Sequence, residues 1–424
     1  MLYRRWLETL ARFRNRTAVF DGATGQRVTF ANLAERLAAR PPTREAIVAR
    51  SGDIGFLVEI LRSWRDGVPA IPVERDAPAP DLPAPPPAGI ALVKHTPGAT
   101  GIPRGIHFRA EALVADAARL ADAMDLSPGR PNLAVISLAQ SYGFSNLVLP
   151  LLLRGVPMHA LPVPFPHAVA EAFKAHDSLA VPAVPSIWRA WFRSGILDRA
   201  PVAQAFSAGA PLPLALETDV HAATGIKIRN FYGASECGGI SLDSNTAPRD
   251  DPTDVGTPLE GVHTSIAPSG RLLVESDAVA EGYDEARPGD VLGGGQFLTH
   301  DIVRIEQRRI LLLSTTGAAI NVAGRKISPA KVETALLSTG LARRARIFGI
   351  PSADPDRVEE IVGMVALAPG ATVSALKQSA VASLADWEFP RHWWSDPPAG
   401  HWSRSAKSLQ SLYLAERQIK STAP

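Results

Sequence analysis

The sequence predicts an α/β protein with a large N-terminal domain, which holds βαβ sheets and a β-rich subdomain, and a small α+β C-terminal domain. Three observations support this fold class. Strand-like and helical patterns alternate up to about residue 260, strand-like runs then follow one another with little helix, and a helix start appears at Ser328-Pro329. A length of 424 residues suggests two or three domains. We expect domains 1–314 and 315–424.

The first half contains a strand, a helix and a second strand. Ile90–Val93 and Leu133–Ile136 are short apolar runs bounded by turn residues, which is typical of buried strands. Between them, the apolar residues of 110–124 recur at helical spacing. This order predicts a βαβ unit within a parallel sheet. Ala180–Val184 and Ile226–Phe231 are predicted to be further strands.

The second half changes character. Arg271–Glu275, Phe297–Ile305 and Ile310–Leu313 are predicted to be the successive strands of the β-rich subdomain. In the tail, Ser328 is an N-cap residue type followed by Pro329, which predicts a helix start. We therefore expect a helix through Val332, Leu336 and Leu337, and strands at Ala345–Gly349 and Ile361–Ala366.

Three stretches interrupt these patterns. Pro78–Gly89 is rich in proline and alanine, so it cannot form a regular helix or a central strand. Gly289–Gly295 is predicted to be a loop, and a further break falls at Ser314–Gly317.

The tryptophan-rich stretch Trp387–Trp402 has two interpretations, the core of the small domain or an exposed patch that docks a carrier protein, and we favour the core.

Composition excludes several classes of protein. The formal charge is 44 − 42 = +2, which argues against nucleic-acid binding through bulk charge. The single cysteine, Cys237, excludes an internal disulfide framework and a cysteine-based zinc site, and the histidines include no HExxH motif. The apolar run Leu147–Leu153 is too short for a membrane span. Residues 1–13 lack the apolar core of a signal peptide, so we expect a cytoplasmic protein.

A Gly/Thr-rich segment, residues 96–105, directly follows a predicted strand. Glycine lets backbone N–H groups approach phosphate oxygens, threonine hydroxyls add donors, and Arg104 supplies positive charge. The spacing is not that of a Walker A loop. A surface turn is the alternative interpretation.

Residues 230–239 also follow a predicted strand. Tyr232 can stack on a flat ring, and Glu236 is an oxygen ligand of the kind that Mg²⁺ prefers beside nucleotide phosphates. The alternative is a turn with a solvated glutamate. Asp301, within Thr299-His300-Asp301, can accept hydrogen bonds from a ribose diol, although a solvated or capping aspartate would fit the local sequence as well.

Together and in this order, the segments resemble the adenylate-forming superfamily, which includes acyl- and aryl-CoA ligases, luciferases and the adenylation domains of peptide synthetases. Residues 96–105 are similar to its T-S-G-T-T-G-x-P-K-G loop and residues 232–236 to its Y-G-x-T-E segment. Residues 299–301 are similar to T-G-D, and residues 324–333 to G-R-x-I-S-P-x-x-V-E. Milder matches are residues 29–33 with T-Y-x-x-L and residues 207–212 with S-G-G-A-P-L.

The resemblance implies a two-step reaction that uses ATP and Mg²⁺. A carboxylate attacks the α-phosphate to give an acyl-adenylate and pyrophosphate, and a thiol then displaces AMP to give a thioester. The resemblance assigns binding of the triphosphate to Thr96, Gly98, Thr100, Gly101 and Arg104, and binding of the rest of the nucleotide to Tyr232, Gly233, Ser235 and Asp301. It assigns the metal to Glu236, and catalysis to Lys407 together with Glu236 and Arg104. It assigns the path of the thiol to Gly324, Arg325 and Lys326. The small domain of the family is mobile and rotates between the two steps.

The sequence departs from the family at the hinge and beside the expected lysine. The family's G-R-x-D-D-x-I-K segment corresponds to residues 314–321, where Thr315 replaces the arginine, Gly317 the acidic residue and Asn321 the basic one. Ala406 replaces the glycine before Lys407, and Arg404 is the nearest rival cation. These departures leave open a degenerate homologue that binds nucleotide or acyl group without turnover.

The segment Ala139–Phe144 resembles the acid-binding H-S-Y-G segment, with Gln140 in place of histidine. It has no aspartate, which argues against an α-amino acid substrate. Polar lining in a short chain favours a small aryl acid such as 4-hydroxybenzoate over a long fatty acid, as in ligases of bacterial aryl-polyene pigment pathways. The acceptor can be coenzyme A or the phosphopantetheine of an acyl carrier protein. The candidate pocket residues are Gln140, Ser141, Tyr142, Ser207, Ala208, Gly209 and Asn230.

Overall fold

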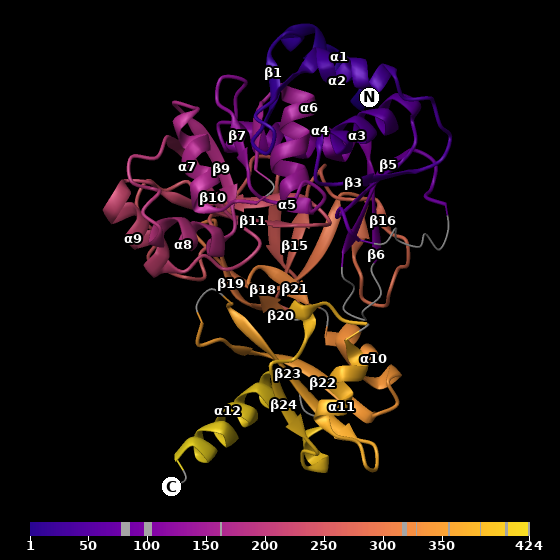
Figure 1. Cartoon of the computed structure of the whole chain (residues 1–424), viewed down its shortest axis with the longest axis vertical. Helices are drawn as coiled ribbons and strands as arrows, with labels where there is room; N and C mark the ends of the chain where they lie inside the picture. Colours follow the sequence, from indigo (N-terminus) through magenta and orange to yellow (C-terminus); the bar gives the residue numbers. More distant parts are fainter. Residues whose placement is uncertain are drawn as a thin grey trace. The chain divides into compact units, whose positions relative to one another are not determined.

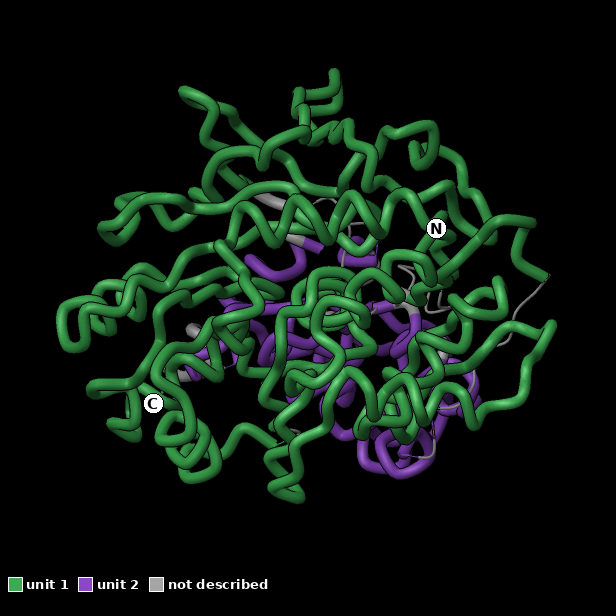
Figure 2. The backbone as a smooth tube through the Cα atoms, turned by 90° about the horizontal axis from the view of Figure 1, so that it is seen from above, with its two compact units in different colours: residues 1–96, 104–315 green, residues 97–103, 316–424 purple. Residues whose placement is uncertain are grey.

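The chain forms two units, each with its own hydrophobic core (Figure 2). The first comprises Met1–Thr96 and Arg104–Thr315, and the second contains Thr316–Pro424. The computed structural model describes residues 1–77, 85–96, 104–161, 163–315, 320–327, 329–354, 357–381, 383–402 and 406–422. In those ranges no helix combines the length and the apolar character that a bilayer crossing requires.

A nine-stranded sheet forms one layer of the first unit. Its central strands, from β11 to β1, run parallel, and antiparallel strands close both edges. Parallel strands covered on both faces are uniformly apolar, which is why these runs are easily recognised in the sequence. In sheet order the strands are β13 (Thr257–Pro258), β12 (Gly238–Leu242), β11 (Ile228–Ala234), β10 (Val202–Ser207), β9 (Leu179–Ala183), β7 (Asn132–Ala134), β8 (Met158–Ala160), β1 (Thr17–Asp21) and β2 (Arg27–Thr29).

Helices cover both faces of this sheet (Figure 1). On one face, Trp188 and Trp191 belong to the same core as the apolar strand residues Leu133 and Ile228. On the other face, Leu113 and the leucines of 147–152 share a core with the second sheet. The covering elements are α7 (Pro166–Lys174), α8 (Pro185–Arg193) and α9 (Leu214–Thr224) on the first face, and α1 (Leu2–Phe13), α4 (Ala110–Ala123), the π-helical turn η1 (Phe144–Val148) and α6 (Leu149–Arg154) on the second.

The predicted βαβ unit at residues 90–136 is wrong, because its two strands belong to different sheets. The second sheet has the order β16 (Gly282–Tyr283), β6 (Arg104–Arg109), β5 (Ile90–Thr96), β4 (Ala70–Val73) and β3 (Ile47–Arg50). Helix α3 (Ile54–Asp66) packs on it, and α2 (Phe30–Ala38) packs on α3. Strand β6 folds back antiparallel on β5. Helix α4 therefore starts from β6 and carries the chain across to β7 in the nine-stranded sheet.

The β-rich part of the first unit contains the three predicted strands. Strand β18 (Gln296–Glu306) pairs with β15 (Arg271–Glu275) and β19 (Arg309–Thr315), and β14 (His263–Ile266) lies at the edge. The predicted loop Gly289–Gly295 contains a short strand, β17 (Leu292–Gly293), because the chain turns back at once and Leu292 pairs with Phe297. Residues 78–84 of the proline-rich stretch lie outside the described residues, and residues 85–89 form no helix or strand.

The second unit packs helices on both faces of a three-stranded sheet. Strands β22 (Ala342–Pro351), β23 (Glu359–Leu367) and β24 (His392–Ser395) form it, and β20 (Ile320–Val322) pairs with β21 (Arg325–Ile327) as a separate hairpin. The predicted helix begins at Pro329 as α10 (Pro329–Ser338) and shares a core with α11 (Val373–Ala380). Helix α12 (Ala406–Thr422) packs through Leu409 in the other core.

The tryptophan-rich stretch belongs mainly to the core, as favoured. Trp394 and Trp402 are buried beside Leu409, and the Trp393 indole donates a hydrogen bond of 3.0 Å to the carbonyl of Pro390. Trp387 differs, because it is 47% exposed and its ring lies 4.0 Å from the guanidinium carbon of Arg325.

Candidate active site

The turn that carries Glu236 joins β11 to β12 and depends on glycine. Gly238 has a φ of +68°, and a Cβ at this position would overlap the carboxylate of Asp116. Asp116 is buried on α4 and accepts a hydrogen bond of 3.1 Å from the backbone N–H of Gly239. The turn is therefore held from the neighbouring helix, which fixes where residues 235–237 lie.

Two separately predicted nucleotide-binding residues lie together. Tyr232 Oη donates a hydrogen bond of 2.6 Å to Asp301 Oδ2. The backbone N–H of Asp301 donates to Thr299 Oγ1 at 3.1 Å, which fixes the strand around the carboxylate. Burial, together with the neighbouring Asp301, raises the pKa of Tyr232 well above its ordinary value. Tyr232 therefore remains a hydrogen-bond donor toward Asp301.

Glu236 belongs to a second group of contacts. Its Oε1 accepts a hydrogen bond of 3.0 Å from Tyr283 Oη. The guanidinium carbon of Arg104 lies 3.5 Å from the centre of the Tyr283 ring. Arg104 also forms an ion pair with Asp290 and donates to the carbonyl of Glu285 at 2.9 Å. Arg104, which the resemblance assigns to the triphosphate, is thus 8% exposed and makes these contacts within the protein.

The pKa shifts of Tyr283 and Asp290 agree with these contacts. Burial raises the pKa of Tyr283 far above its ordinary value, and the neighbouring Glu236 adds to this effect. Burial opposes ionisation of Asp290, but the hydrogen bonds from Arg104 and the Arg287 backbone outweigh it and lower the pKa of the Asp290 carboxyl. Tyr283 therefore keeps its proton and remains a hydrogen-bond donor. Asp290 remains ionised and can pair with Arg104.

Glu236 fits a magnesium ion that is held mainly by nucleotide phosphates. Its Oε1 is engaged by Tyr283, whereas its Oε2 accepts no hydrogen bond from the described residues. In that part of the chain, no three His, Cys, Asp or Glu side chains are grouped as a metal site. Mg²⁺ beside a nucleotide needs only one or two carboxylates, because phosphates and water supply its other ligands.

The predicted acid-binding segment contacts the Glu236 turn. Ser141 Oγ and Ser235 Oγ are 2.9 Å apart, and the Tyr142 and Phe231 rings are 5.9 Å apart between centres. Tyr142 Oη donates to the carbonyl of Phe206 at 3.4 Å. Burial raises the pKa of Tyr142 well above its ordinary value. These contacts bring the predicted acid-binding and nucleotide-binding segments into one region of the first unit.

Of the remaining candidate pocket residues, Ser207, Ala208 and Asn230 are buried, whereas Gly209 and Gln140 are exposed. Ser207 ends β10 and pairs in register with Asn230 within the neighbouring parallel strand β11, and Ala208 and Gly209 follow Ser207. The hydroxyl of Ser207 is buried and has no hydrogen-bond partner among the described residues. Gln140 is exposed, and its Nε2 donates to Glu74 Oε1 at 3.0 Å.

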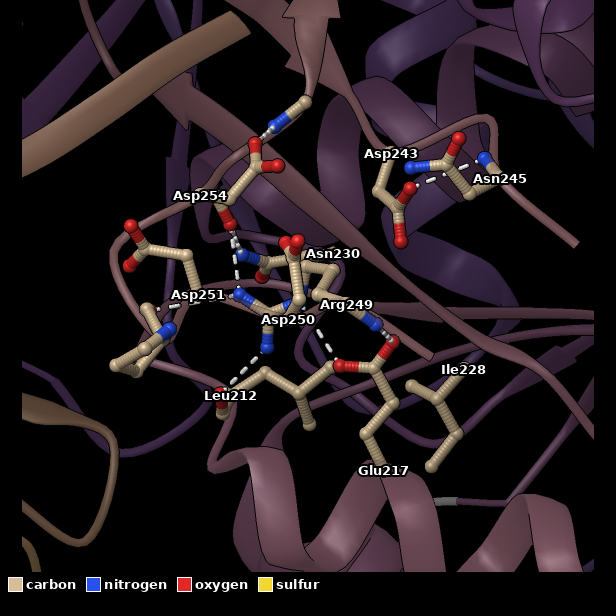
Figure 3. Close-up of polar contacts among 12 residues, drawn as sticks. Leu212, Glu217, Ile228, Asn230, Asp243, Asn245, Arg249, Asp250, Asp251 and Asp254 are labelled. Atoms are coloured by element: carbon tan, nitrogen blue, oxygen red, sulfur yellow. Dashed lines mark hydrogen bonds and ion pairs between the residues drawn. The ribbon is translucent and has the colours of Figure 1, made fainter. Parts of the chain in front are cut away.

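A buried cluster of charged residues holds Asn230 in place through the backbone of Asp254 (Figure 3). Asn230 Nδ2 donates to the carbonyl of Asp254 at 2.9 Å. Arg249 donates to the same carbonyl and to that of Leu212, each at 2.7 Å. Its Nε donates to Glu217 Oε2 at 2.8 Å, and both side chains have no exposed surface. Lys227 extends the cluster by pairing with Glu217 and Asp243.

Lys94 and Cys237 are buried near the Glu236 turn. Lys94 is 4% exposed, and its ammonium lies 4.8 Å from the centre of the Phe108 ring. Burial lowers the pKa of Lys94, although Asp116 partly counteracts the shift. Cys237 is also buried, and burial raises the pKa of its thiol.

Several predicted residues fall at or beyond the limits of the described chain. Thr96 and Arg104 pair as the last and first residues of β5 and β6, so residues 97–103 connect the two strands. Gly98, Thr100, Gly101, Gly317 and Arg404 lie outside the described residues. Thr315 ends β19, and Lys407 lies in the first turn of α12.

The predicted thiol-path residues lie in the second unit. Gly324 and Arg325 belong to the hairpin of β20 and β21, and Lys326 follows them in β21. The backbone N–H of Gly324 donates to Asn321 Oδ1 at 3.0 Å, and the N–H of Asn321 donates to Glu359 Oε2 at 2.6 Å. Asn321, which replaces the basic residue of the family, therefore stabilises this hairpin.

The sequence reasoning missed four residues that contact the predicted ones. Tyr283 and Asp290 engage Glu236 and Arg104, Glu74 engages Gln140, and Arg249 supports Asn230 through Asp254. A single aromatic residue in a polar, glycine-rich stretch is a signal that could have identified Tyr283. The other three are isolated charged residues with no local pattern around them.

Comparison with known proteins places these observations in context. The model of the AMP-binding enzyme family matches residues 49–284. A long-chain-fatty-acid–CoA ligase of Bacillus subtilis is 24% identical over 71% of this chain, and the chain spans 57% of that ligase. A probable 2-succinylbenzoate–CoA ligase of Mycobacterium tuberculosis is 28% identical over 71% of this chain and 78% of its own length. A 4-hydroxybenzoate–CoA/benzoate–CoA ligase of Rhodopseudomonas palustris is 26% identical over 71% of this chain and 60% of its own.

Solved structures match nearly the whole chain. An amide bond synthetase from Marinactinospora thermotolerans superposes with a TM-score of 0.82 at 20% identity, covering 97% of this chain and 99% of that one. An o-succinylbenzoate CoA synthetase from Bacillus subtilis superposes with a TM-score of 0.81 at 17% identity, covering 96% and 98%. At these identities the superpositions show a shared fold.

Proposed function

Because the chain belongs to the AMP-binding enzyme family, whose model matches residues 49–284, we propose that it activates a small carboxylic acid with ATP and transfers the acyl group to a thiol. In the first step a carboxylate oxygen of the acid attacks the α-phosphorus of ATP, forming an acyl-adenylate and releasing pyrophosphate. In the second step the thiol sulfur attacks the acyl carbon, its proton is lost, and AMP leaves. The product is a thioester.

The observation that carries this proposal is the hydrogen bond of 2.6 Å between Tyr232 and Asp301. Two residues assigned independently to adenine and ribose hold each other in one place, which is what a nucleotide site requires. The contact of 2.9 Å between Ser141 and Ser235 adds the acid-binding segment to the same region. In the alternative interpretation these are solvated turn residues. Such residues are not expected to form hydrogen bonds with partners 69 and 94 positions away in the sequence.

The roles of the protein groups follow from the charge that develops. Bound Mg²⁺ would neutralise phosphate charge, and the Glu236 carboxylate would hold it. In our proposal the backbone and hydroxyl groups of Thr96, Gly98, Thr100 and Gly101 bind the triphosphate. Lys407 is proposed to offset charge at the α-phosphate and the acid, from the small mobile domain 315–424.

The acid is proposed to be a small aryl acid such as a hydroxybenzoate. The Tyr142 ring, packed against Phe231, offers an aromatic wall, and the buried Ser207 hydroxyl offers a polar group with no partner among the described residues. Relatives named for 4-hydroxybenzoate and for anthranilate support an aryl acid. A relative named for long-chain fatty acids supports the alternative of a fatty-acid ligase.

The acceptor is proposed to be coenzyme A or the phosphopantetheine of an acyl carrier protein. Gly324, Arg325 and Lys326 are proposed to line the path of this thiol. Relatives named as CoA ligases favour coenzyme A, whereas the likeness to aryl-polyene pigment enzymes favours a carrier protein. We place the reaction in the cytoplasm.

A second candidate is a degenerate homologue that binds nucleotide without turnover. The specific observation in its favour is that Arg104 is already paired with Asp290 and stacked on Tyr283. Thr315 and Gly317, which replace the family's arginine and acidic residue at the hinge, also favour the degenerate homologue.

Pyrophosphate release separates these candidates. The protein is incubated with ATP, Mg²⁺ and, in turn, hydroxybenzoic, cinnamic and fatty acids of increasing chain length. Release with an aryl acid, abolished by Glu236→Gln, is the expected result. Release only with fatty acids overturns the substrate class. No release with any acid, together with measurable ATP binding, favours the degenerate homologue.

A further inference from the structure

Four residues from three separate stretches of the sequence form one continuous chain of contacts that ends at the metal-binding candidate. Asp290 pairs with Arg104, Arg104 stacks on Tyr283, and Tyr283 donates to Glu236. Strand β16 places Tyr283 by pairing antiparallel with β6, in register with Ile106. Arg104 begins β6, so the stacked pair is fixed by adjacent strands of one sheet.

The surrounding backbone holds this arrangement from both sides. Gly105 N–H donates to Asp284 Oδ2 at 2.8 Å, and the Asp284 N–H donates back to the Gly105 carbonyl at 2.9 Å. The Arg287 N–H donates to Asp290 Oδ2 at 2.8 Å, which orients the carboxylate toward Arg104. The loop from 284 to 290 is therefore tied to the start of β6 through Asp284, Glu285 and Asp290.

Arg104 is surrounded mainly by protein groups. Its side chain is 9% exposed, and one terminal nitrogen serves Asp290 and the carbonyl of Glu285. Its guanidinium carbon lies 3.5 Å from the centre of the Tyr283 ring, and its Nε is buried without a hydrogen-bond partner among the described residues. An arginine that stacks and pairs in this way acts on its protein neighbours, because a planar guanidinium fixes the ring beneath it.

The Tyr283 hydroxyl meets the carboxylate proposed to hold the metal. A glutamate side chain has three rotatable bonds, and ordering it has an entropic cost. The hydrogen bond of 3.0 Å to Oε1 restricts these rotations and leaves Oε2 without a partner among the described residues. One oxygen is thereby fixed to the protein and the other is presented for coordination.

We infer that Tyr283 is a positioning residue that orients Glu236 toward a magnesium–nucleotide complex, and that Arg104 holds Tyr283 in place instead of contacting the triphosphate itself. This inference rests on the proposed function, because it needs ATP and Mg²⁺ as ligands. It replaces the direct role that the resemblance assigns to Arg104, and it adds Tyr283 to the site.

Binding of ATP over a range of Mg²⁺ concentrations, measured by calorimetry, tests the inference without any turnover. In the unaltered protein Mg²⁺ should strengthen ATP binding. In Tyr283→Phe, which loses only the hydroxyl, the strengthening by Mg²⁺ should shrink about three- to tenfold, while binding in EDTA stays the same. Tyr3→Phe, at a partly buried position of α1 that packs against the core of the first unit, is the matched control and should behave as the unaltered protein.

Two further variants separate positioning from a general loss of structure. In Glu236→Gln the added change Tyr283→Phe should have no further effect on Mg²⁺ dependence, because the two residues act through one contact. Arg104→Lys keeps the charge but loses the planar stack, so it should reproduce the Tyr283→Phe effect. A direct phosphate role predicts instead that Arg104→Lys keeps its Mg²⁺ dependence and Arg104→Met weakens ATP binding in EDTA.

The outcomes distinguish this inference from the proposed function. If Glu236→Gln abolishes the Mg²⁺ dependence and Tyr283→Phe does not reduce it, the inference is wrong and the proposed function stands. Equal weakening by Tyr283→Phe with and without Mg²⁺ also overturns it. If the unaltered protein binds no ATP, both fall.

Discussion

Tyr232 Oη and Asp301 Oδ2 are joined by a hydrogen bond of 2.6 Å across 69 positions of the chain. The two residues belong to different sheets, since Tyr232 lies in β11 and Asp301 in β18. The bond therefore ties the nine-stranded sheet to the β-rich part of the first unit at the candidate nucleotide site.

Loss of this pair should weaken ATP use selectively. We expect Asp301→Ala to raise the KM for ATP about 10- to 100-fold, because the ribose loses its acceptor. Tyr232→Phe should raise it about three- to tenfold, because the ring remains and only the hydroxyl is lost. Pyrophosphate exchange at varied ATP measures both, with Tyr413→Phe in the second unit as the control. A rise in the KM for the acid alone would contradict the assignment.

Arg249 should be essential for stability. Arg249→Met leaves the carboxylate of Glu217 buried beside a neutral side chain, which should lower the free energy of unfolding by about 3–5 kcal/mol. Arg304→Met removes an exposed pair with Glu306 and should cost less than about 1 kcal/mol. Urea unfolding of both variants measures the difference. Equal losses would mean that Lys227 alone satisfies Glu217.

Acid should destabilise the first unit through His159 and His176, whose ring nitrogens lie 2.9 Å apart. Burial and the neighbouring His176 lower the pKa of His159 from 6.5 to about 4. Between these values the unfolded chain binds a proton that the folded chain does not, so stability falls as the pH drops from about 6.5 toward 4. The loss should be about 1–3 kcal/mol.

Urea unfolding at pH 7 and pH 5 checks this pH dependence. His159→Gln should flatten the acid-side loss, whereas His263→Gln, at an exposed position, should leave it unchanged. An identical acid-side loss in His159→Gln and in the unaltered protein would show that other groups are responsible.

Gly238 should tolerate no side chain. Gly238→Ala forces a left-handed backbone on alanine and drives its Cβ into Asp116, which cannot move without losing its bond to Gly239. Gly289→Ala imposes a similar φ of +85° with no atom within 4 Å of the new Cβ, and should cost about 1–2 kcal/mol. We expect Gly238→Ala to cost about 1–3 kcal/mol more in thermal or urea unfolding. Equal costs would show that Asp116 yields.

Lys407 is predicted to serve only the first half-reaction. Lys407→Ala should abolish pyrophosphate release, while thioester formation from supplied acyl-adenylate survives, because the second step needs no charge at the α-phosphate. Lys174→Ala, at an exposed helix position in the first unit, is the control. Unchanged release in Lys407→Ala would transfer the role to another cation, with Arg404 the first to examine.

Local patterns predicted the elements well and their partners poorly. The apolar runs of β5, β9 and β15 and the helical spacing of α4 were readable, because burial of these segments is uniform or strictly periodic. The pairing of β5 was not, because a hairpin formed by the polar strand β6 redirects the chain to another sheet. Strand pairing depends on contacts that no short window contains.

The candidate site divides in the same way. Tyr232, Glu236 and Asp301 could be identified because each stands in a motif with a recognisable order. Their partners could not, since Tyr283 meets Glu236 across 47 positions and Asp290 meets Arg104 across 186. Arg249 and Glu217, 32 positions apart, are two ordinary charged residues until the fold buries them together.

Because Cys237 is buried, its reaction with a thiol reagent can report on the opening of the turn that holds it. It is the only cysteine in the sequence and is 1% exposed between Glu236 and Gly238. A thiol reagent can reach it only when this turn opens, so the rate of labelling measures how often the turn opens. Ligands that hold the turn closed would slow the labelling. Cysteines introduced on the surface for fluorophores would react over a background that is nearly silent.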